Sequence, residues 1–357
     1  MPAEAAQDQA LETAGRRARN YGLRLAFALS FGFVAALAVD SILPFLVPLL
    51  ALQILLNSPK PLPLAQGVGV LAMALVVAHL FVLTIGVLGE RPAILMLFVG
   101  LICFLCFAAQ AMVKGGAAVG LILTIMVITL VLGMAQTELG ASIVGILLKS
   151  MLAGLVLSWI AHALFPDPGG PLPGGMRRHP LPNPLSYAAA NAVIVVATLA
   201  LCFSSSTFQT AIVVPLTVIS LLSQADATTS GKTIIGLLVV NLFGGIVASI
   251  AFVPVTARSE LILLFMLLLT IGLVFGGRAA NPRDGRIYAG ALMVFTIIFG
   301  LGVSPIPTTA PESFATRMNM LFVAVTIAAC GIGLLWRTNA SQPPAPPTQP
   351  SPKETSA

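Results

Sequence analysis

The chain has 357 residues, of which 58% are hydrophobic and 8% are charged, and its mean hydropathy is +1.01. Soluble domains carry about 25% charged residues, so this composition excludes a water-exposed globule of this size. A net charge of +6 would suggest nucleic-acid binding in a soluble protein. In a membrane protein Lys and Arg gather in cytoplasmic loops instead, so we predict a lipid bilayer as partner and no nucleic acid.

Twelve continuous apolar runs follow one another along the chain, and a membrane-spanning helix needs about 20 such residues. In the first half the runs cover residues 22–39, 41–56, 66–88, 92–110, 115–134 and 141–164. In the second half they cover residues 186–203, 208–223, 233–253, 260–277, 286–304 and 316–336. The sequence therefore predicts an all-α polytopic membrane protein with twelve transmembrane helices, of which 41–56 and 208–223 are short for a bilayer.

Polar segments separate two apolar blocks. The predicted parts are a frayed, polar cytoplasmic N-terminus (1–20), a first six-helix repeat (21–165), a Pro- and Gly-rich cytoplasmic linker (166–185), a second six-helix repeat (186–336) and a disordered cytoplasmic tail (337–357). The tail is polar and rich in proline, a composition that cannot bury a core.

The basic residues predict an orientation. With the N-terminus in the cytoplasm, only three of the 18 Lys and Arg residues, Arg91, Arg258 and Arg317, fall on the outer side, and Lys149 falls inside a span. Cytoplasmic loops carry an excess of Lys and Arg, so we predict a multi-pass protein of the bacterial inner membrane with both termini in the cytoplasm.

The two halves also repeat in sequence. At a constant shift of 167 residues, Val-Pro-Leu at 47–49 falls on Val-Pro-Leu at 214–216, and Arg91 falls on Arg258. Six spans in each half give both copies the same orientation. We therefore predict a 6+6 parallel internal repeat about an axis along the membrane normal.

Two basic side chains inside spans are the first candidates for function, because charged groups at membrane depth are costly. His79 in the third run and Lys149 in the sixth lie at similar predicted depths, so we expect them to share one cavity and to favour an anionic substrate or exchange protons. The alternatives are that Lys149 extends to the outer interface and that His79 is a packed, hydrogen-bonded histidine.

Three more polar residues are candidate ligands for substrate or protons. Asp40 lies between two spans with almost no loop, where it either couples protons or is an ordinary loop charge. Arg24 begins the first span and either binds an anion or anchors the helix at the headgroups. Asn241 in the ninth run is expected to line the same cavity.

Prolines mark matching places in the two halves. Pro44, Pro48 and Pro215 remove backbone donors, so we predict helix breaks there, and broken helices in both halves indicate a transport site. Cys103 and Cys106 form a C-x-x-C inside an apolar run, where packing explains them better than metal or redox chemistry. We predict no metal, no cofactor and no catalytic residue, and hence no enzyme.

The opening of the chain carries a family likeness. The stretch from Leu23-Arg24-Leu25 to Val39-Asp40, followed by a short proline-bearing span that ends near Gln53, resembles the fusaric acid resistance and aromatic acid exporter superfamily. The resemblance covers residues 22–336 and rests mainly on the 6+6 plan.

The resemblance implies a proton-driven efflux permease for small, anionic aromatic or hydrophobic compounds, working with a periplasmic membrane fusion protein. Long members of that superfamily carry a large cytoplasmic domain between the halves. Here only residues 166–185 link them, so the chain resembles the compact branch.

Two other functions remain open. A major-facilitator-type transporter has the same number of spans, although the loop 57–64 lacks the glycine, acid and paired basic residues typical of that family. A membrane assembly subunit without its own substrate also fits the composition. A homo-oligomer is compatible with each of these functions.

Overall fold

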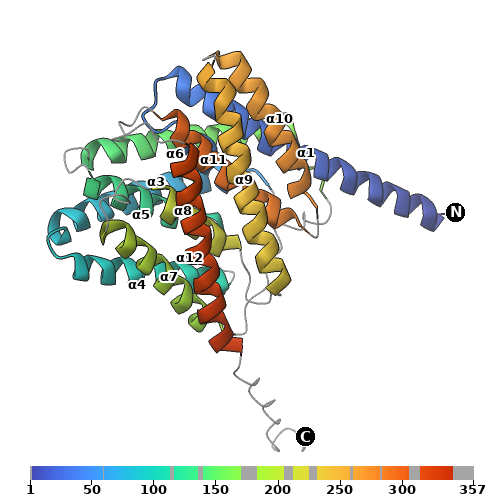
Figure 1. Cartoon of the computed structure of the whole chain (residues 1–357). Coiled ribbons are helices and arrows are strands. Elements are labelled where there is room, and N and C mark those ends of the chain that lie inside the picture. Colours follow the sequence, from blue (N-terminus) through green and yellow to red (C-terminus); the bar gives the residue numbers. More distant parts are fainter. Residues whose placement is uncertain are drawn as a thin grey trace, which may run out of the picture.

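The computed structural model describes residues 2–58, 60–112, 116–135, 140–169, 183–204, 212–224, 231–257, 260–281, 284–304 and 314–340. Within these ranges the chain forms twelve α-helices and no strand (Figure 1). The first six helices are α1 (Pro2–Ala38), α2 (Leu46–Asn57), α3 (Leu64–Leu88), α4 (Pro92–Ala111), α5 (Gly116–Ala135) and α6 (Gly140–Leu164). The second six are α7 (Pro184–Ser204), α8 (Val213–Gln224), α9 (Gly231–Ala257), α10 (Leu261–Ala279), α11 (Gly285–Val303) and α12 (Phe314–Ala340).

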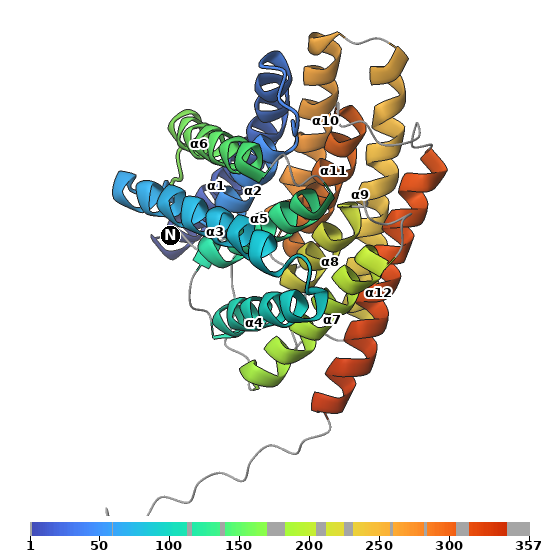
Figure 2. The same cartoon turned by 90° about the vertical axis from the view of Figure 1, so that its left-hand side faces the viewer.

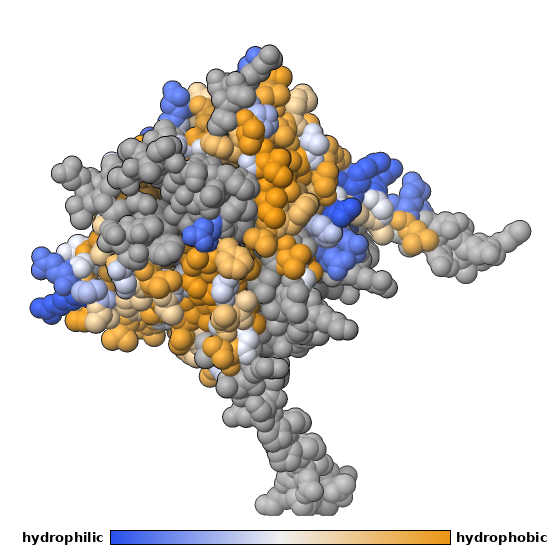
Figure 3. Space-filling view, in the orientation of Figure 1, coloured by the Kyte–Doolittle hydropathy of each residue, from blue (hydrophilic) through white to orange (hydrophobic). Residues whose placement is uncertain are grey.

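Six of these helices are long and apolar enough to cross a membrane, namely α1, α3, α4, α6, α7 and α10. The other six have shorter apolar stretches among the described residues. Large apolar side chains lie on the outside, for example Leu97 on α4 and Ile262 on α10, each 75% exposed. Figure 3 shows apolar side chains over much of the visible surface. Exposed apolar area on this scale suits lipid rather than water, so the chain is a multi-span helical membrane protein.

The two short helices α2 and α8 match each other closely. Each has 12 residues, and both ends of α8 lie at the predicted shift of 167 from those of α2. Twelve residues extend about 18 Å at 1.5 Å per residue, which is too short for a hydrocarbon core of about 30 Å. The prediction that these two segments are short is therefore confirmed.

The prolines of these segments begin the helices rather than interrupt them. Pro48 is the third residue of α2 and Pro215 the third of α8, where the backbone N–H has no partner within the helix. Pro44 precedes α2 and is buried. The predicted breaks therefore appear as late helix starts, because a proline costs little in the first turn and much in a helix interior.

Both ends of the chain contain more helix than the composition predicts. The N-terminal segment 1–20, expected to be frayed, belongs to α1 from Pro2 onward. A proline in the first turn and a run rich in Ala, Gln, Glu and Arg favour helix there. At the other end, residues 337–340 continue α12, and the rest of the predicted tail lies outside the described residues.

The helices pair in the same way in both halves. The closest partner of α1 is α10 in the second half, and the matching helix α7 packs against α4 in the first half. Likewise α3 packs with α5 and α9 with α11, while α2 packs with α6 and α8 with α12. The first helix of each half therefore has its main packing partner in the other half.

The helix directions differ from a single parallel bundle. In both views α9, α10 and α12 run upright, whereas α3, α4 and α6 run across (Figures 1 and 2). The pairing repeats between the halves, although the two sets of helices run in different directions.

Candidate functional site

A cavity lies where the second and fifth helices of both halves meet. It is bordered by α2, α5, α8 and α11, with one residue each from α1 and α4, and the space open to the centre of a water molecule is about 110 Å³. One water needs about 10–15 Å³ by this measure, so the cavity has room for several waters or a small ligand. The lining residues are Tyr21, Leu49, Gln53, Leu56, Asn57, Gln110, Gly120, Thr124, Leu216, Ile219, Ser220, Ser223, Ala289, Gly290, Met293 and Ile297.

The repeat places equivalent residues on opposite walls of this cavity. Leu49 on α2 corresponds to Leu216 on α8 at the shift of 167, and Gln53 corresponds to Ser220. Contacts between α5 and α8, and between α2 and α11, join the halves around it. The cavity therefore lies at the interface between the two halves.

A hydrogen bond fixes the side chain of Gln53 in the lining. Its Nε2 donates to Oγ1 of Thr124 at 2.6 Å, and that hydroxyl donates to the carbonyl oxygen of Gly120 at 3.0 Å. A hydroxyl has one hydrogen, so Thr124 accepts from Gln53, which fixes the orientation of the amide. The other amide atom, Oε1 of Gln53, is buried and has no hydrogen-bond partner among the described residues.

Further uncharged polar groups surround Gln53. Asn57 Nδ2 donates to the backbone oxygen of Gln53 at 2.7 Å, one turn along α2. From the opposite helix α8, Ser220 and Ser223 face the cavity, and Oγ of Ser223 is buried without a hydrogen-bond partner among the described residues. Amides and hydroxyls supply the polar side chains of the described lining residues, among which there is no Asp, Glu, Lys, Arg or His.

Arg24 contacts the lining residue Tyr21. Its guanidinium lies over the ring of Tyr21, 5.9 Å from the centroid, and Tyr21 borders the cavity. Only 2% of Arg24 is exposed, and its predicted role as an anion ligand or a headgroup anchor stays a prediction. Its Nε donates to the backbone oxygen of Asn20 at 3.4 Å. Arg24 thus adds a buried positive charge behind one wall of the cavity.

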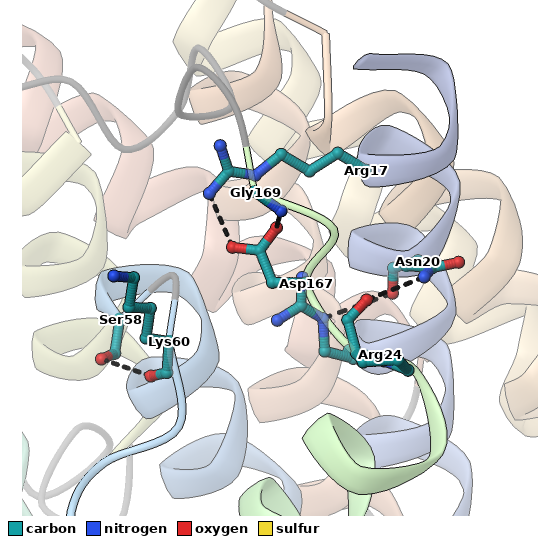
Figure 4. A network of polar contacts seen from close by, with 8 residues as sticks. Arg17, Asn20, Arg24, Ser58, Lys60, Asp167 and Gly169 are labelled. Carbon is teal, nitrogen blue, oxygen red and sulfur yellow. Dashed lines mark hydrogen bonds and ion pairs between the residues drawn. The ribbon is translucent and has the colours of Figure 1, made fainter. Parts of the chain in front are cut away.

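A buried ion pair lies on the same side of α1. Arg17 binds Asp167 at 2.6 Å, and their side chains are 6% and 9% exposed (Figure 4). Asn20 donates to the backbone oxygen of Pro166 at 2.8 Å. These contacts join α1 to the segment that follows α6, at the end of the chain's first half.

His79 and Lys149 do not line this cavity. Both are exposed, His79 on α3 and Lys149 on α6, although these two helices pack against each other. Nδ1 of His79 bonds the backbone oxygen of Leu75 at 2.9 Å, one turn back on its own helix. Their predicted role as substrate or proton ligands stays a prediction.

Asp40 has a clear local role. Its φ of 51° lies in the left-handed region, its N–H donates to Leu37 O at 3.1 Å, and Ser41 N–H donates to Ala36 O at 3.0 Å. This pair of bonds is the Schellman motif that closes a helix, here α1, and Asp tolerates this conformation better than most residues. The carboxylate is exposed beside the start of α2. Its predicted part in proton coupling stays a prediction.

Asn241 lies on α9, but its side chain is outside the described part of the structure. Among the residues that the structure describes, no three His, Cys, Asp or Glu side chains gather closely enough to hold a metal ion. Cys103 and Cys106 are buried on α4 and form no disulfide.

The polar groups that line the cavity carry little signal in the sequence. Gln53 is marked only as the end of a short span, and nothing singles out Thr124 or Ser220. One signal was present: Gln53 and Ser220 are polar residues at equivalent positions of two apolar helices, at the same shift as the Val-Pro-Leu repeat. No protein-family model, no curated protein and no solved structure matches the chain.

Proposed function

We propose that this chain is an inner-membrane efflux permease and that its substrate, a small organic compound, passes through the cavity between the two halves. The observation that carries the proposal is the position of this cavity. It lies against two helices that are too short to cross a bilayer and that occupy equivalent places in the two halves.

Short or broken helices at matching positions are the structural element with which many transporters form a site at membrane depth. Backbone that ends inside a membrane is tolerated where it is buried in protein or faces a cavity. The ends of α2 and α8 meet this condition, because Asn57 and Ser223 near their C-terminal ends both line the cavity. A site shared by two halves also suits alternating access, in which the halves move against each other.

The remaining parts of the proposal rest on sequence. The distribution of Lys and Arg supports cytoplasmic termini. Export, proton coupling and a periplasmic membrane fusion protein come from the resemblance to the fusaric acid resistance and aromatic acid exporter superfamily. The chemistry needs no covalent step, so we assign the chain no enzymatic activity.

The test is an accumulation assay in an efflux-deficient bacterial strain that expresses the full chain. Cells are loaded with a panel of neutral and acidic aromatic compounds and dyes, and the retained amount is measured with and without a proton uncoupler. We expect lower retention of at least one compound, and Gln53→Leu should raise that retention toward the level of the empty strain. Gln66→Leu is the matched control, because Gln66 is exposed on α3.

Three outcomes are informative. If expression changes the retention of no compound, the permease proposal fails. If retention falls and Gln53→Leu behaves like Gln66→Leu, transport stands but does not use this cavity. Lys149→Ala and His79→Ala, assayed in parallel, decide whether these exposed basic residues take part.

A further inference from the structure

We propose that the cavity opens at one end only and that Phe45, packed against Gly300, is a gate that closes the other end. The assignment rests on the proposed function, and it adds a specific place at which the two halves part. With the N-terminus in the cytoplasm, α2 and α8 end on the cytoplasmic side, so the open end faces the cytoplasm and the gate faces outward.

The exposure of the lining residues falls along each helix of the cavity. On α11, Ala289 is half-buried, whereas Met293 and Ile297, one and two turns further along, are 8% and 2% exposed. On α2, Asn57 near the C-terminal end is half-buried, and Leu49 near the start is 1% exposed. The cavity is therefore open where α2 ends and α11 begins.

The other two helices of the cavity show the same change. On α8, Ser223 near the C-terminal end is half-buried, whereas Leu216 near the start is 2% exposed. On α5, Gly120 near the start is half-buried, and Thr124, one turn further along, is 3% exposed. All four helices thus place their more exposed lining residues at one end of the cavity and their buried ones toward the other.

Phe45 lies at the closed end, between α2 and α11. It is fully buried and directly precedes α2, one turn before Leu49 of the lining. Gly300 follows Ile297 by three residues on α11, so both lie on the same side of that helix. A Cβ built on Gly300 would overlap the Cβ of Phe45 and lie 3.0 Å from Cε1 of Phe33. Phe45 therefore fills the space beyond the end of the lining.

Two further features belong to the closed end. Oγ of Ser304, just after α11, donates to the backbone oxygen of Ile42 at 2.6 Å and joins α11 to the turn before α2. In the second half, Ile212 occupies the position of Phe45 at the shift of 167 and is 3% exposed. Each short helix therefore begins behind a buried apolar side chain.

The contact between Phe45 and Gly300 joins two groups of helices. The main packing partner of α2 is α6, in the first half, whereas α1 and α11 both pack against α10. A movement of these two groups against each other separates Phe45 from Gly300 and opens the outer end. Such a movement is the step that alternating access requires of a site between two halves.

The experiment measures from which side of the membrane the cavity is reached. Single cysteines are placed in the full chain after its four native cysteines are replaced, and their reaction with a membrane-impermeant thiol reagent is followed in permeabilised-outer-membrane cells and in inside-out vesicles. Val39→Cys, 75% exposed at the end of α1, marks the outer side. We expect Ala289→Cys and Met293→Cys to react from the side opposite to Val39→Cys.

Removal of the Phe45 ring should open the closed end. In Phe45→Ala, Met293→Cys should react from the Val39 side about tenfold faster or more, because loss of a large buried side chain shifts an opening equilibrium by at least that factor. Phe81→Ala is the matched control, because Phe81 is 1% exposed on α3 and does not line the cavity. Equal reaction rates in these two variants would overturn the gate.

The unaltered gate gives an independent measurement if Phe45→Ala does not fold. Reaction of Ala289→Cys and Val39→Cys from the same side, or of Met293→Cys equally from both sides, would show that the cavity is not closed at one end and would overturn the proposal. Reaction of all three cysteines from the side opposite to that expected would reverse the orientation and leave the gate in place.

The outcomes also separate the gate from the proposed function. Labelling as expected in a chain that moves no compound would support the gate and reject the permease. Transport by the unaltered chain, with Phe45→Ala and Phe81→Ala labelled alike, would keep the permease and reject the gate.

Discussion

Arg17 and Asp167 form a buried ion pair between α1 and the segment after α6, with only 6% and 9% of their side chains exposed. Arg24 lies on the same side of α1, and its charge interacts with both members of the pair. The Asp167 carboxylate therefore pairs with Arg17 and also interacts electrostatically with Arg24. Buried charges of this kind depend on each other more than surface pairs do, because neither has water as an alternative partner.

The first prediction follows from the presence of one carboxylate beside two guanidinium groups. Asp167→Ala leaves two buried positive charges without their shared carboxylate, and breaking a buried pair costs about 3–5 kcal/mol. We expect a marked fall in the unfolding midpoint of the detergent-purified protein, followed by thermal or denaturant unfolding. Replacing both partners, as Arg17→Met with Asp167→Ala, should cost less than the sum of the single changes.

Arg16 offers a matched control on the same helix. It is exposed, so Arg16→Met should change the free energy of unfolding by about 0.5 kcal/mol or less. If Asp167→Ala is no more destabilising than Arg16→Met, the ion pair contributes nothing to the fold.

At the scale of elements, the crossing of α1 and α10 depends on small residues. A Cβ built on Gly272 would lie 2.7 Å from Ala26 Cα, and one on Gly276 would lie 2.8 Å from Gly22 O. Both pairs are spaced four residues apart on their helices, the small-xxx-small pattern that lets membrane helices approach closely. Gly277, the next residue along, faces open space.

These neighbours give the second prediction. Gly276→Ala forces the two backbones apart and should destabilise the protein by about 1–3 kcal/mol, the usual cost of overpacking. Gly277→Ala should be neutral or stabilising by up to about 1 kcal/mol, because alanine favours helix more than glycine does. Thermal unfolding of both variants in the same detergent checks the difference. Equal midpoints for the two variants would show that the crossing tolerates a methyl group.

At the scale of the whole molecule, the halves exchange their first helices. The main packing partner of α1 is α10, and that of α7 is α4. If one half is missing, the first helix of the other half therefore loses its main packing partner. Large buried side chains also meet across the halves, as Phe33 of α1 does with Phe299 of α11 at a centroid distance of 5.5 Å. The two repeats form one packing unit.

The third prediction is that neither half is stable alone. A chain divided between residues 169 and 183 should yield halves that are degraded or aggregated when expressed singly and that copurify when expressed together. Size-exclusion chromatography and helical circular dichroism in detergent measure this. A first half that is monodisperse and unfolds cooperatively by itself would contradict the exchange of helices.

Much of the element structure was predictable from the sequence, because it depends on local properties. The apolar run at 92–110 became α4 (Pro92–Ala111), and that at 141–164 became α6 (Gly140–Leu164). An apolar run must form helix where no water satisfies its backbone, so its length sets the length of the helix. The sequence predicts that Pro48 breaks the short second helix, and only the fold shows that it lies in the first turn of that helix.

The site was not predictable in the same way. His79 and Lys149 stood out because charge inside an apolar run is conspicuous, yet both are exposed in the fold. Gln53 and Thr124 are ordinary polar residues in sequence, 71 positions apart, and only the packing of α2 against α5 brings them to 2.6 Å. Composition and the lengths of the apolar runs thus predicted a helical membrane protein and, within the described residues, its twelve helices, two of which are short and equivalent. The tertiary structure alone decided which helices meet, because pairing between distant segments depends on side-chain fit that no local pattern records.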